Sequence, residues 1–496
     1  MKNYLHLQNG SDVRGVALPG VEGEEVTLTP EAASDIAAAF AIWISEKTGK
    51  DPDDLEISVG TDSRLSANII KKSVFEGLRK TGANCADCGI ASTPAMFMST
   101  VLPGCQFNGS IMITASHLPW NRNGLKFFSP SGGLEKKEIM TILELAAQLP
   151  LIDEDQGKKR NFNVIDPYSG YLRRIITDQT GTDETPLSGF KIAVDAGNGA
   201  GGFFAEKVLK PLGADISFSQ FLEPDGRFPN HVPNPEDQTA MAAAKKMVTD
   251  NRCDLGLIFD TDVDRAGAVD ITGEVFSRNR LIGLLAAIES RRHPGCTIVT
   301  DSVTSDQLSD FLTNKLGCIH HRYKRGYRNV INECIRLNKE GINCPIAIET
   351  SGHCAYAENY FLDDGAYLSC KLIIEMARLR IEGKTLSDVI RDLRDPLESS
   401  EMRLKIRNQD PTAYSKRILG DLKDYAKQKS TWKIAEKNYE GLRFSLPEFA
   451  GWFLLRASLH DPLLVLNIES DQENGVVSIF NDLKPFLDQY QELEIR

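Results

Sequence analysis

The sequence predicts an α/β protein of three similar domains, followed by a smaller C-terminal α+β domain. Three observations support this prediction. Strand-like apolar runs alternate with helical patterns over the first 150 residues, an order typical of a parallel sheet. An apolar strand that leads into a polar turn rich in Gly or Ser occurs three times. The segment after residue 397 instead combines charged helices with short strands.

The expected elements follow from these patterns. In the first domain, apolar runs flanked by turn residues predict strands, and helical periodicity predicts helices. The expected strands are 55–60 and 110–114, and the expected helices are 30–46, 67–81 and 136–148. In the last domain we expect a helix at 413–427 and strands near 441–445 and 452–456.

The three copies of the strand-turn pattern set the domain organisation. They stand at residues 57–66, 192–202 and 297–305, roughly 105 to 135 residues apart, which is too long a period for a solenoid repeat. Polar connections between them place the boundaries near residues 160, 276 and 397. The predicted domains are therefore 1–160, 161–276, 277–397 and 398–496.

Composition and charge exclude several classes of protein. The 496 residues are 41% hydrophobic and 25% charged, as in an ordinary globular enzyme, which argues against a fibrous or disordered chain. With 57 Lys and Arg against 69 Asp and Glu, the net charge is −12. Nucleic acid is therefore not an expected partner, because it requires a basic face. An anionic substrate would need cations concentrated in one place.

We expect a cytoplasmic protein without a membrane partner. The longest apolar run, residues 36–44, is far shorter than the roughly 20 residues that a bilayer requires, and the first residues resemble neither a signal peptide nor a transit peptide. Ten scattered cysteines suit reduced, buried thiols. Cys85 and Cys88 have the spacing of a metal or redox pair, but without a second pair nearby a structural role is favoured.

A first candidate loop follows the strand predicted at 110–114. Its sequence is TASHLPWNRNGLKFF, and Ser116 stands where the strand ends, the position at which α/β sheets expose active-site side chains. Ser116 is the candidate nucleophile, and His117 is a possible proton carrier. Lys126 can neutralise a phosphate or exchange a proton. A plain surface loop is the alternative for this segment taken alone.

A second loop, DTDVDR, follows the buried strand pattern LGLIF. Asp260, Asp262 and Asp264 at alternate positions would repel one another unless a cation joins them, and their hard oxygen ligands favour Mg²⁺. An EF-hand is excluded because its Gly and Glu positions hold Arg265 and Ile271. An aspartate-nucleophile phosphatase has Thr or Val where Asp264 stands. A solvated acidic turn remains the other alternative.

Two further loops also follow apolar strands. The segment ETSGH contains Glu349, Ser351 and His353, which can bind sugar hydroxyls. The segment RASLHDP contains Arg456 and Ser458, a pair that can hold a phosphate together with backbone N–H groups. Each segment taken alone is a weak signal, and for RASLHDP a surface turn is at least as good a reading.

The order and spacing of these loops resemble the α-D-phosphohexomutases, the family of phosphoglucomutase and phosphomannomutase, over residues 10 to about 469. The four loops are similar to the family's TASHNP, D-G-D-x-D-R, G-E-x-S-G-H and R-x-S-G-T-E-P motifs. Supporting matches are NGSDVRG, GTDSRLS, Thr93-Pro94 and PDGRFPNHVPNP. The chain departs from the family pattern with Thr261 in place of a Gly, Ile348 in place of the Gly before Glu349, and Leu459-His460-Asp461 in place of Gly-Thr-Glu.

The resemblance implies three mixed-sheet α/β domains and the C-terminal domain around a central cleft, with a hinge near 397–402. It also implies an isomerase that interconverts hexose 1-phosphate and hexose 6-phosphate, through phosphorylated Ser116 and a bisphosphorylated sugar. ETSGH resembles both the phosphomannomutase/phosphoglucomutase and the phosphoglucosamine mutase branches, and we favour the former because Glu and Ser can read hydroxyls that the glucose and mannose epimers share. The alternatives are a phosphoglucosamine mutase, a noncatalytic sugar-phosphate-binding protein, and a Mg²⁺ phosphatase with Asp260 as nucleophile.

The resemblance further assigns roles to residues. Mg²⁺ would be the cofactor, glucose 1,6-bisphosphate the activator and a hexose phosphate the partner of a monomer or homodimer. The expected catalytic residues are Ser116, His117, Lys126, Arg14 and Arg265; the metal ligands are Ser116, Asp260, Asp262 and Asp264; and the substrate-binding residues are Glu349, Ser351, His353, Arg456, Ser458, His460, Gly326 and Arg328.

Overall fold

The computed structural model describes residues 2–150, 157–181, 184–458 and 461–494. The chain forms two compact units. The first comprises Met1–Ile288 and Ser351–Val389, and the second comprises Glu289–Thr350 and Ile390–Arg496. Each unit is described in turn.

The first unit begins with a mixed sheet whose strand order is β1-β2-β6-β5-β3-β4-β8, with β7 paired to β6. β3 is parallel to β4 and β5, whereas β6 is antiparallel to β5 and β2. The mixed sheet that the family resemblance implies is therefore confirmed: β5 and β6 are antiparallel because a short loop joins them, and a parallel pair needs a long crossover. The strands are β1 (Gln8–Asn9), β2 (Asp12–Val16), β3 (Glu56–Thr61), β4 (Asn84–Ile90), β5 (Gly109–Ile113), β6 (Arg122–Ser129), β7 (Gly132–Gly133) and β8 (Lys159–Asn161).

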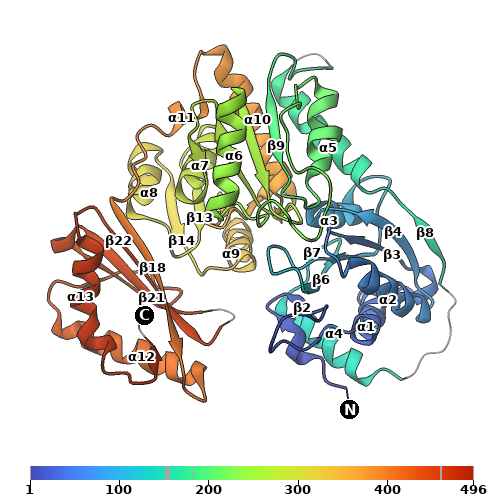
Figure 1. The fold of residues 1–496 in the computed structure, drawn as a ribbon, viewed down its shortest axis with the longest axis horizontal. Helices are drawn as coiled ribbons and strands as arrows, with labels where there is room; N and C mark the ends of the chain where they lie inside the picture. Colours follow the sequence, from blue (N-terminus) through green and yellow to red (C-terminus); the bar gives the residue numbers. More distant parts are fainter. Residues whose placement is uncertain (1, 151–156, 182–183, 459–460, 495–496) are drawn as a thin grey trace. The chain divides into compact units, whose positions relative to one another are not determined.

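Helices cover both faces of this sheet. Figure 1 shows α1, α2 and α4 together on one side, where their apolar residues form one cluster with β3, β5 and β6. On the other side Ser99 of α3 shares a hydrogen bond with Ser58 of β3. The helices of this region are α1 (Pro30–Thr48), α2 (Ala67–Lys80), α3 (Thr93–Val101), α4 (Lys136–Gln148) and α5 (Ile165–Thr180), so the three predicted helices end within two residues of the observed ones.

Local chemistry explains where the first helix begins and ends. The Thr29 hydroxyl accepts a hydrogen bond from Ala32 N, and Pro30 occupies the first turn, a combination that favours helix initiation. Gly49 ends the helix at a φ of 68°, a left-handed conformation that glycine adopts at little cost.

The second sheet of this unit has the order β12-β11-β10-β9. β9 and β10 are parallel, and β11 is antiparallel to both β10 and β12. The predicted strand LGLIF is β10, buried along its whole length. The elements of this region are β9 (Ile192–Asp195), β10 (Leu255–Phe259), β11 (Ala266–Asp270), β12 (Val275–Phe276), β16 (Cys354–Tyr356), β17 (Leu362–Asp363), α6 (Gln238–Asn251), α10 (Gly365–Ile381) and α11 (Leu386–Val389), with α7 at Arg278–Arg292.

The second unit contains three parallel strands and a six-stranded antiparallel sheet. β13 (Thr297–Thr300) is parallel to β14 (Ile319–Arg322) and β15 (Ile346–Ile348), with helices α8 (Asp306–Asp310) and α9 (Tyr327–Lys339). The antiparallel sheet has the order β19-β20-β21-β22-β18-β23. Its elements are β18 (Glu398–Ile406), β19 (Lys433–Ile434), β20 (Leu442–Leu446), β21 (Gly451–Ala457), β22 (Leu463–Ser470), β23 (Leu493–Glu494), α12 (Pro411–Tyr425) and α13 (Gly475–Leu487). The predicted fold class of three α/β regions and a C-terminal α+β domain is confirmed.

The two faces of the antiparallel sheet pack against different parts of the second unit. Figure 1 shows α12 and α13 on one side of this sheet, where they share a buried apolar cluster with it. On the opposite face, Trp452 and Leu454 pack against Val303. Arg443 lies 3.5 Å from the Trp452 ring centroid and donates to the Ser302 and Thr304 carbonyls at 3.1 Å. The C-terminal sheet is therefore docked onto the loop that follows β13, while the hinge near 397–402 stays a prediction.

Two other expectations can be compared with the structure. None of the helices in the described part of the chain combines the length and the hydropathy needed to cross a bilayer.

Cys85 and Cys88 both lie on β4 and are buried. Residues three apart on a strand point to opposite faces, so the spacing of this pair does not form a shared metal site.

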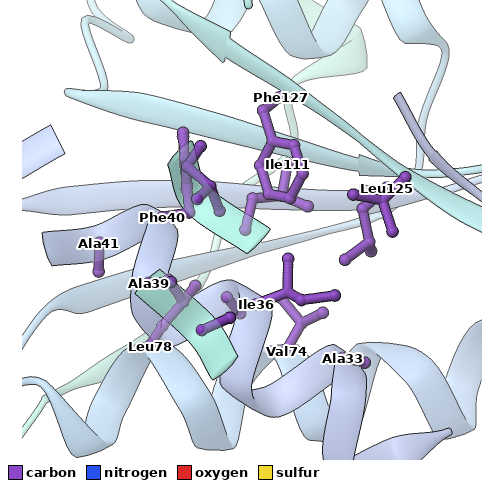
Figure 2. Close-up of a cluster of buried hydrophobic side chains, with 14 of the residues drawn as sticks. Ala33, Ile36, Ala39, Phe40, Ala41, Val74, Leu78, Ile111, Leu125 and Phe127 are labelled. Atoms are coloured by element: carbon purple, nitrogen blue, oxygen red, sulfur yellow. The ribbon is translucent and has the colours of Figure 1, made fainter. Parts of the chain in front are cut away.

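The core of the first sheet provides a test of the packing. Figure 2 shows Phe40 of α1 beside Ile111 and Phe127, above Leu78 of α2. The rings of Phe40 and Phe127 are 4.8 Å apart, and a Cβ atom at Gly109 would lie 2.9 Å from the Phe40 ring. The sheet and helix therefore meet at a position where only glycine leaves room for the ring.

Phe40→Ala should destabilise this domain by about 3–5 kcal/mol, the usual cost of truncating a buried aromatic residue. Amide hydrogen exchange in β3 and β5 should become faster by the corresponding factor. Ile69→Ala on α2 is the control, because Ile69 is 52% exposed and should change exchange little. Equal exchange in the two variants would show that Phe40 is not central to this core.

Candidate functional site

The predicted nucleophile lies in a strained turn directly after β5. Ser116 is buried and has a φ of 52°, a conformation that is uncommon for residues other than glycine and often marks functional sites. Its backbone N–H donates to the Thr114 hydroxyl at 2.9 Å, and that hydroxyl donates to Asp62 at 2.7 Å. The turn is thus fixed by side chains at the ends of the adjacent strands β3 and β5.

Arg64 holds the rest of this loop. Its buried guanidinium donates to the backbone carbonyls of Ser116 and Leu118 at 2.5 Å, Pro119 at 2.7 Å and Arg122 at 3.0 Å. Burial lowers the pKa of Arg64, and the Asp62 carboxylate opposes that shift. Sequence reasoning used GTDSRLS only as a supporting match and did not identify Arg64, because its partners are carbonyls that any residue supplies.

The Ser116 hydroxyl contacts a carboxylate, a guanidinium and an imidazole. It donates to Asp260 Oδ2 at 3.0 Å, accepts from Arg265 Nη2 at 2.9 Å and lies 3.3 Å from His117 Nδ1. Arg265 also donates to His117 Nδ1 at 2.7 Å. Because a guanidinium only donates, this nitrogen acts as an acceptor, which places the proton of a neutral His117 on Nε2.

Asp260, Asp262 and Asp264 gather at the carboxyl end of β10. One carboxylate oxygen from each lies within 4.8 Å of the others, and all three residues are buried. Lys126, which β6 supplies, donates to Asp262 at 2.9 Å and to Asp264 at 2.6 Å. The Thr93 hydroxyl also donates to Asp262 at 2.5 Å. The acidic loop is thus joined by Lys126 and Thr93, which come from distant parts of the sequence.

The charges around this trio shift the pKa values of its members in opposite directions. Burial raises the pKa of Asp260 well above its ordinary value, and the Asp264 carboxylate adds to that rise. Burial also opposes ionisation of Asp264, but the Lys126 ammonium holds its pKa well below the ordinary value. The Arg265 charge, together with burial, lowers the pKa of His117 to about 2, and burial lowers that of His353 to about 3. Both imidazoles are therefore neutral at physiological pH.

The trio fits a hard divalent cation. The Oδ1 atoms of Asp262 and Asp264 are buried and make no hydrogen bond with any described residue. A buried carboxylate oxygen without a partner is costly, and Mg²⁺ prefers such oxygen ligands. The donor set therefore matches the expected ion, with the Ser116 oxygen within hydrogen-bonding distance of Asp260.

The backbone around the trio is closely packed. The residue in the left-handed region is Val263, with a φ of 66°, and Thr261 is not among the described residues of positive φ. Thr261 therefore replaces the family's Gly without backbone strain. A Cβ atom on Gly199 would lie 2.7 Å from the Thr261 carbonyl oxygen, and one on Gly365 would lie 2.6 Å from the Arg265 backbone. Two glycines thus allow neighbouring segments to approach the acidic loop.

Three other predicted residues of this unit lie near the same loops. Arg14 on β2 pairs with Gly124 in register and donates to Asp12 at 2.8 Å. Its charge helps to lower the pKa of His117. His353 has its Nε2 3.7 Å from Asp264 and its Nδ1 2.8 Å from the Ser351 hydroxyl. Ser351 and His353 are thus linked to the acidic trio.

The second unit holds a separate group of predicted residues. Glu349 is buried and accepts a hydrogen bond from Gly326 N at 2.5 Å. Glu440 accepts from Arg325 N at 2.9 Å and from Arg456 at 3.5 Å. Glu440 was missed by sequence reasoning, because it lies in a loop without any recognisable motif. It joins the loop before α9 to the strand that carries Arg456.

The remaining predicted residues are placed as follows. Ser458 follows β21 and its hydroxyl accepts from Asp461 N at 3.2 Å. Arg328 is in the first turn of α9. His460 lies outside the described residues.

Three family descriptions match this chain. Residues 6–149, 169–273 and 277–397 match domains I, II and III of "Phosphoglucomutase/phosphomannomutase, alpha/beta/alpha". The chain belongs to this family. The Ser116 loop and the acidic trio lie within the matches to domains I and II of the phosphoglucomutase/phosphomannomutase family, respectively.

Relatives of this phosphoglucomutase/phosphomannomutase family member align over nearly the whole chain. A phosphomannomutase/phosphoglucomutase of Pseudomonas syringae is 29% identical over 93% of this chain and 90% of its own length. A phosphoglucomutase of Neisseria gonorrhoeae is 27% identical over 96% of this chain and 95% of its own length. A phosphomannomutase of Salmonella montevideo is 28% identical over 94% of this chain and 95% of its own length.

Solved structures show the same fold. A phosphoglucomutase/phosphomannomutase family protein of Burkholderia thailandensis superposes with a TM-score of 0.76 at 26% identity, covering 97% of this chain and 96% of its own. A phosphomannomutase of Thermus thermophilus, described as putative, superposes with a TM-score of 0.72 at 20% identity, over 98% and 100% of the two chains. At that identity the second match supports the fold alone.

Arg64→Ala should lower phosphoryl transfer by roughly 100-fold, because four carbonyls of the Ser116 loop lose their donor and a shift of about 1 Å in a reacting group has an effect of that size. The measurement is the rate at which Ser116 becomes phosphorylated by glucose 1,6-bisphosphate, followed by intact mass. Arg79→Ala, which removes another arginine of the same domain that donates to a backbone carbonyl, is the control. An unchanged rate in Arg64→Ala would contradict the positioning role.

Proposed function

We propose that this chain is a phosphohexomutase that interconverts hexose 1-phosphate and hexose 6-phosphate, with glucose and mannose phosphates as the favoured substrates. The observation that carries the proposal is the Ser116 hydroxyl, 3.0 Å from Asp260 of a buried acidic trio and 2.9 Å from Arg265. The names of the aligned relatives support the same reaction.

Ser116 would carry the phosphoryl group between turnovers. In the first transfer, the bond between phosphorus and the Ser116 oxygen breaks, and a bond to the free hydroxyl of the hexose phosphate forms. The second transfer returns the other phosphoryl group of the bisphosphorylated sugar to Ser116. Arg265, Arg14 and Lys126 would offset the negative charge that spreads over the transferred group, since preorganised cations stabilise such transition states.

Lys126 is the proposed proton carrier. It lies between two carboxylates and can give a proton to the Ser116 oxygen as that oxygen leaves, then receive one from the attacking sugar hydroxyl. His117 would assist through its neutral imidazole. Mg²⁺ held by Asp260, Asp262, Asp264 and the Ser116 phosphate would supply electrostatic stabilisation of the transferred phosphoryl group when bound.

Substrate recognition is assigned to both units. Glu349, Ser351 and His353 are proposed to bind sugar hydroxyls, and Arg456, Ser458 and His460 the phosphate that does not react. Gly326 and Arg328 would form the turn that senses sugar orientation. Glucose 1,6-bisphosphate is proposed to activate the enzyme by phosphorylating Ser116. The central cleft, the cytoplasmic location and the monomer or homodimer stay predictions.

The phosphatase alternative is disfavoured by the contacts of Asp260. Its carboxylate accepts three hydrogen bonds from Arg265, from the backbone N–H, Nε and Nη2, at 3.0 to 3.2 Å. It also accepts one from the Ser116 hydroxyl. An oxygen engaged by several donors is a poor nucleophile. The Ser116 oxygen faces the same cations and is the better candidate.

Ser116→Ala should abolish conversion of glucose 1-phosphate to glucose 6-phosphate in the presence of Mg²⁺ and a trace of glucose 1,6-bisphosphate. The wild-type protein incubated with the bisphosphate should gain one phosphoryl group, mapped to Ser116 by mass spectrometry. Ser131→Ala, in the turn between β6 and β7, is the control. Full turnover by Ser116→Ala would favour the phosphatase, and no product from any hexose 1-phosphate would favour the noncatalytic binding protein.

Asp262→Asn should weaken Mg²⁺ binding by roughly 100-fold or more. Loss of a residue that only contacts a metal ligand already lowers affinity by roughly 10–100-fold, and Asp262 is a proposed ligand itself. The readout is the Mg²⁺ concentration for half-maximal rate, with chelation by EDTA abolishing activity in the wild type. Asp254→Asn, which changes a carboxylate just before the amino end of β10, should leave that concentration unchanged. An Asp262→Asn variant with wild-type Mg²⁺ dependence would refute the assigned metal site.

A further inference from the structure

A row of cations lies on the face of the C-terminal sheet opposite α12 and α13. Arg403, Lys405 and Arg407 occupy alternate positions on and just after β18, and alternate strand residues share a face. The intervening Leu404 and Ile406 are buried in the core under α12 and α13. The three cations therefore point away from the helices, on the face that is open to solvent at this end.

The same face carries the proposed phosphate-binding residues. In the sheet register Arg403 is opposite Val465, which is opposite Arg456. One step along, Lys405 is opposite Leu463, whose carbonyl accepts from Ser458 N at 2.9 Å. Two strand spacings separate β18 from β21, about 10 Å. The cation row is thus a lateral continuation of the phosphate site.

A cavity of about 230 Å³ lies along this row and is lined by Arg403, Lys405, Arg407 and Glu494. Glu494 forms an ion pair with Arg407, and Glu401 lies 3.3 Å from Arg403. The side chains of Arg403 and Arg407 are each 65% exposed. Three cations and one carboxylate therefore face a space that a phosphate group can enter.

This cluster of three cations is unexpected because the chain as a whole is acidic, with a net charge of −12. Like charges on neighbouring positions of one sheet face repel each other. Such a concentration of cations attracts and retains anions near the surface, and guanidinium groups bind phosphate through paired N–H donors. The row thus suits a phosphate ester.

We propose that Arg403, Lys405 and Arg407 retain the bisphosphorylated sugar while it turns between its two transfers. This inference rests on the proposed function. The intermediate leaves Ser116 with two phosphates. Its other phosphate must reach Ser116 before the intermediate dissociates from the protein. A phosphate released from Arg456 finds the next cation two strands away on the same face, about 10 Å from it, so the intermediate stays bound through a series of weak contacts.

The experiment measures how often the intermediate escapes. Wild-type protein carrying a ³²P-phosphoryl group on Ser116 is mixed with unlabelled glucose 1-phosphate, and the label is divided between free glucose 1,6-bisphosphate and glucose 6-phosphate. In the triple variant Arg403→Gln/Lys405→Gln/Arg407→Gln, the ratio of bisphosphate to monophosphate should rise roughly tenfold, because each exposed charge contact contributes about a factor of two. A wild-type ratio in this variant would overturn the proposal.

The matched control is Lys416→Gln/Lys423→Gln/Lys427→Gln, which removes three charges from the region of α12 on the other side of the same sheet. Its ratio of bisphosphate to monophosphate should equal that of the wild type. If the ratio rises as much as in the triple variant of Arg403, Lys405 and Arg407 (the β18 variant), net charge alone matters and the proposal is overturned. Added salt should raise escape from the wild type, since salt screens exposed charges, and should have less effect on the β18 variant. If the proposed function itself is wrong, no label will pass from Ser116 to sugar even in the wild type.

Discussion

Everything in the first unit depends on keeping three buried carboxylates together at the end of β10. Their mutual repulsion in a dry site is large, and the structure offsets it with one cation from β6 and one from the acidic loop itself. Lys126 bridges Asp262 and Asp264, while Arg265 pairs with Asp260 and also reaches the Ser116 hydroxyl. Ser116, the proposed nucleophile, is therefore held by the same charges that stabilise the acidic trio.

The scaffold around this cluster serves to hold short loops in unusual conformations. Ser116 and Val263 both have positive φ, and neither is glycine, so the surrounding contacts must compensate for the strain. Arg64 supplies that compensation for the first loop through four backbone carbonyls. Close approach at Gly199 and Gly365 confines the second loop. Burial of the site and rigidity of the loops are thus produced by the same packing.

Much of the fold could be predicted from the sequence, because the signals are local. The helical pattern that begins at Pro30 and the apolar run at 255–259 place α1 and β10 within two residues of where they lie. Contacts across the chain are different: Ser116 and Asp260 are 144 positions apart, and only the resemblance to a family placed them together. Periodicity also does not distinguish parallel from antiparallel pairing, so the mixed sheet with its antiparallel β5–β6 edge followed from the family resemblance and not from the pattern. Arg64 and Glu440 act through backbone groups and through a loop without a motif, so no pattern of residue types marks them.

The position of Glu440 has a consequence for how specificity could change. This carboxylate accepts from the Ser302 hydroxyl, from Arg325 N and from Arg456, so one side chain couples the loop proposed to sense the sugar to the strand proposed to hold the phosphate. A single substitution of Glu440 would therefore perturb both proposed recognition elements. Divergence toward a new substrate is thereby constrained: the two halves of recognition must evolve in concert, or the coupling residue must be exchanged first.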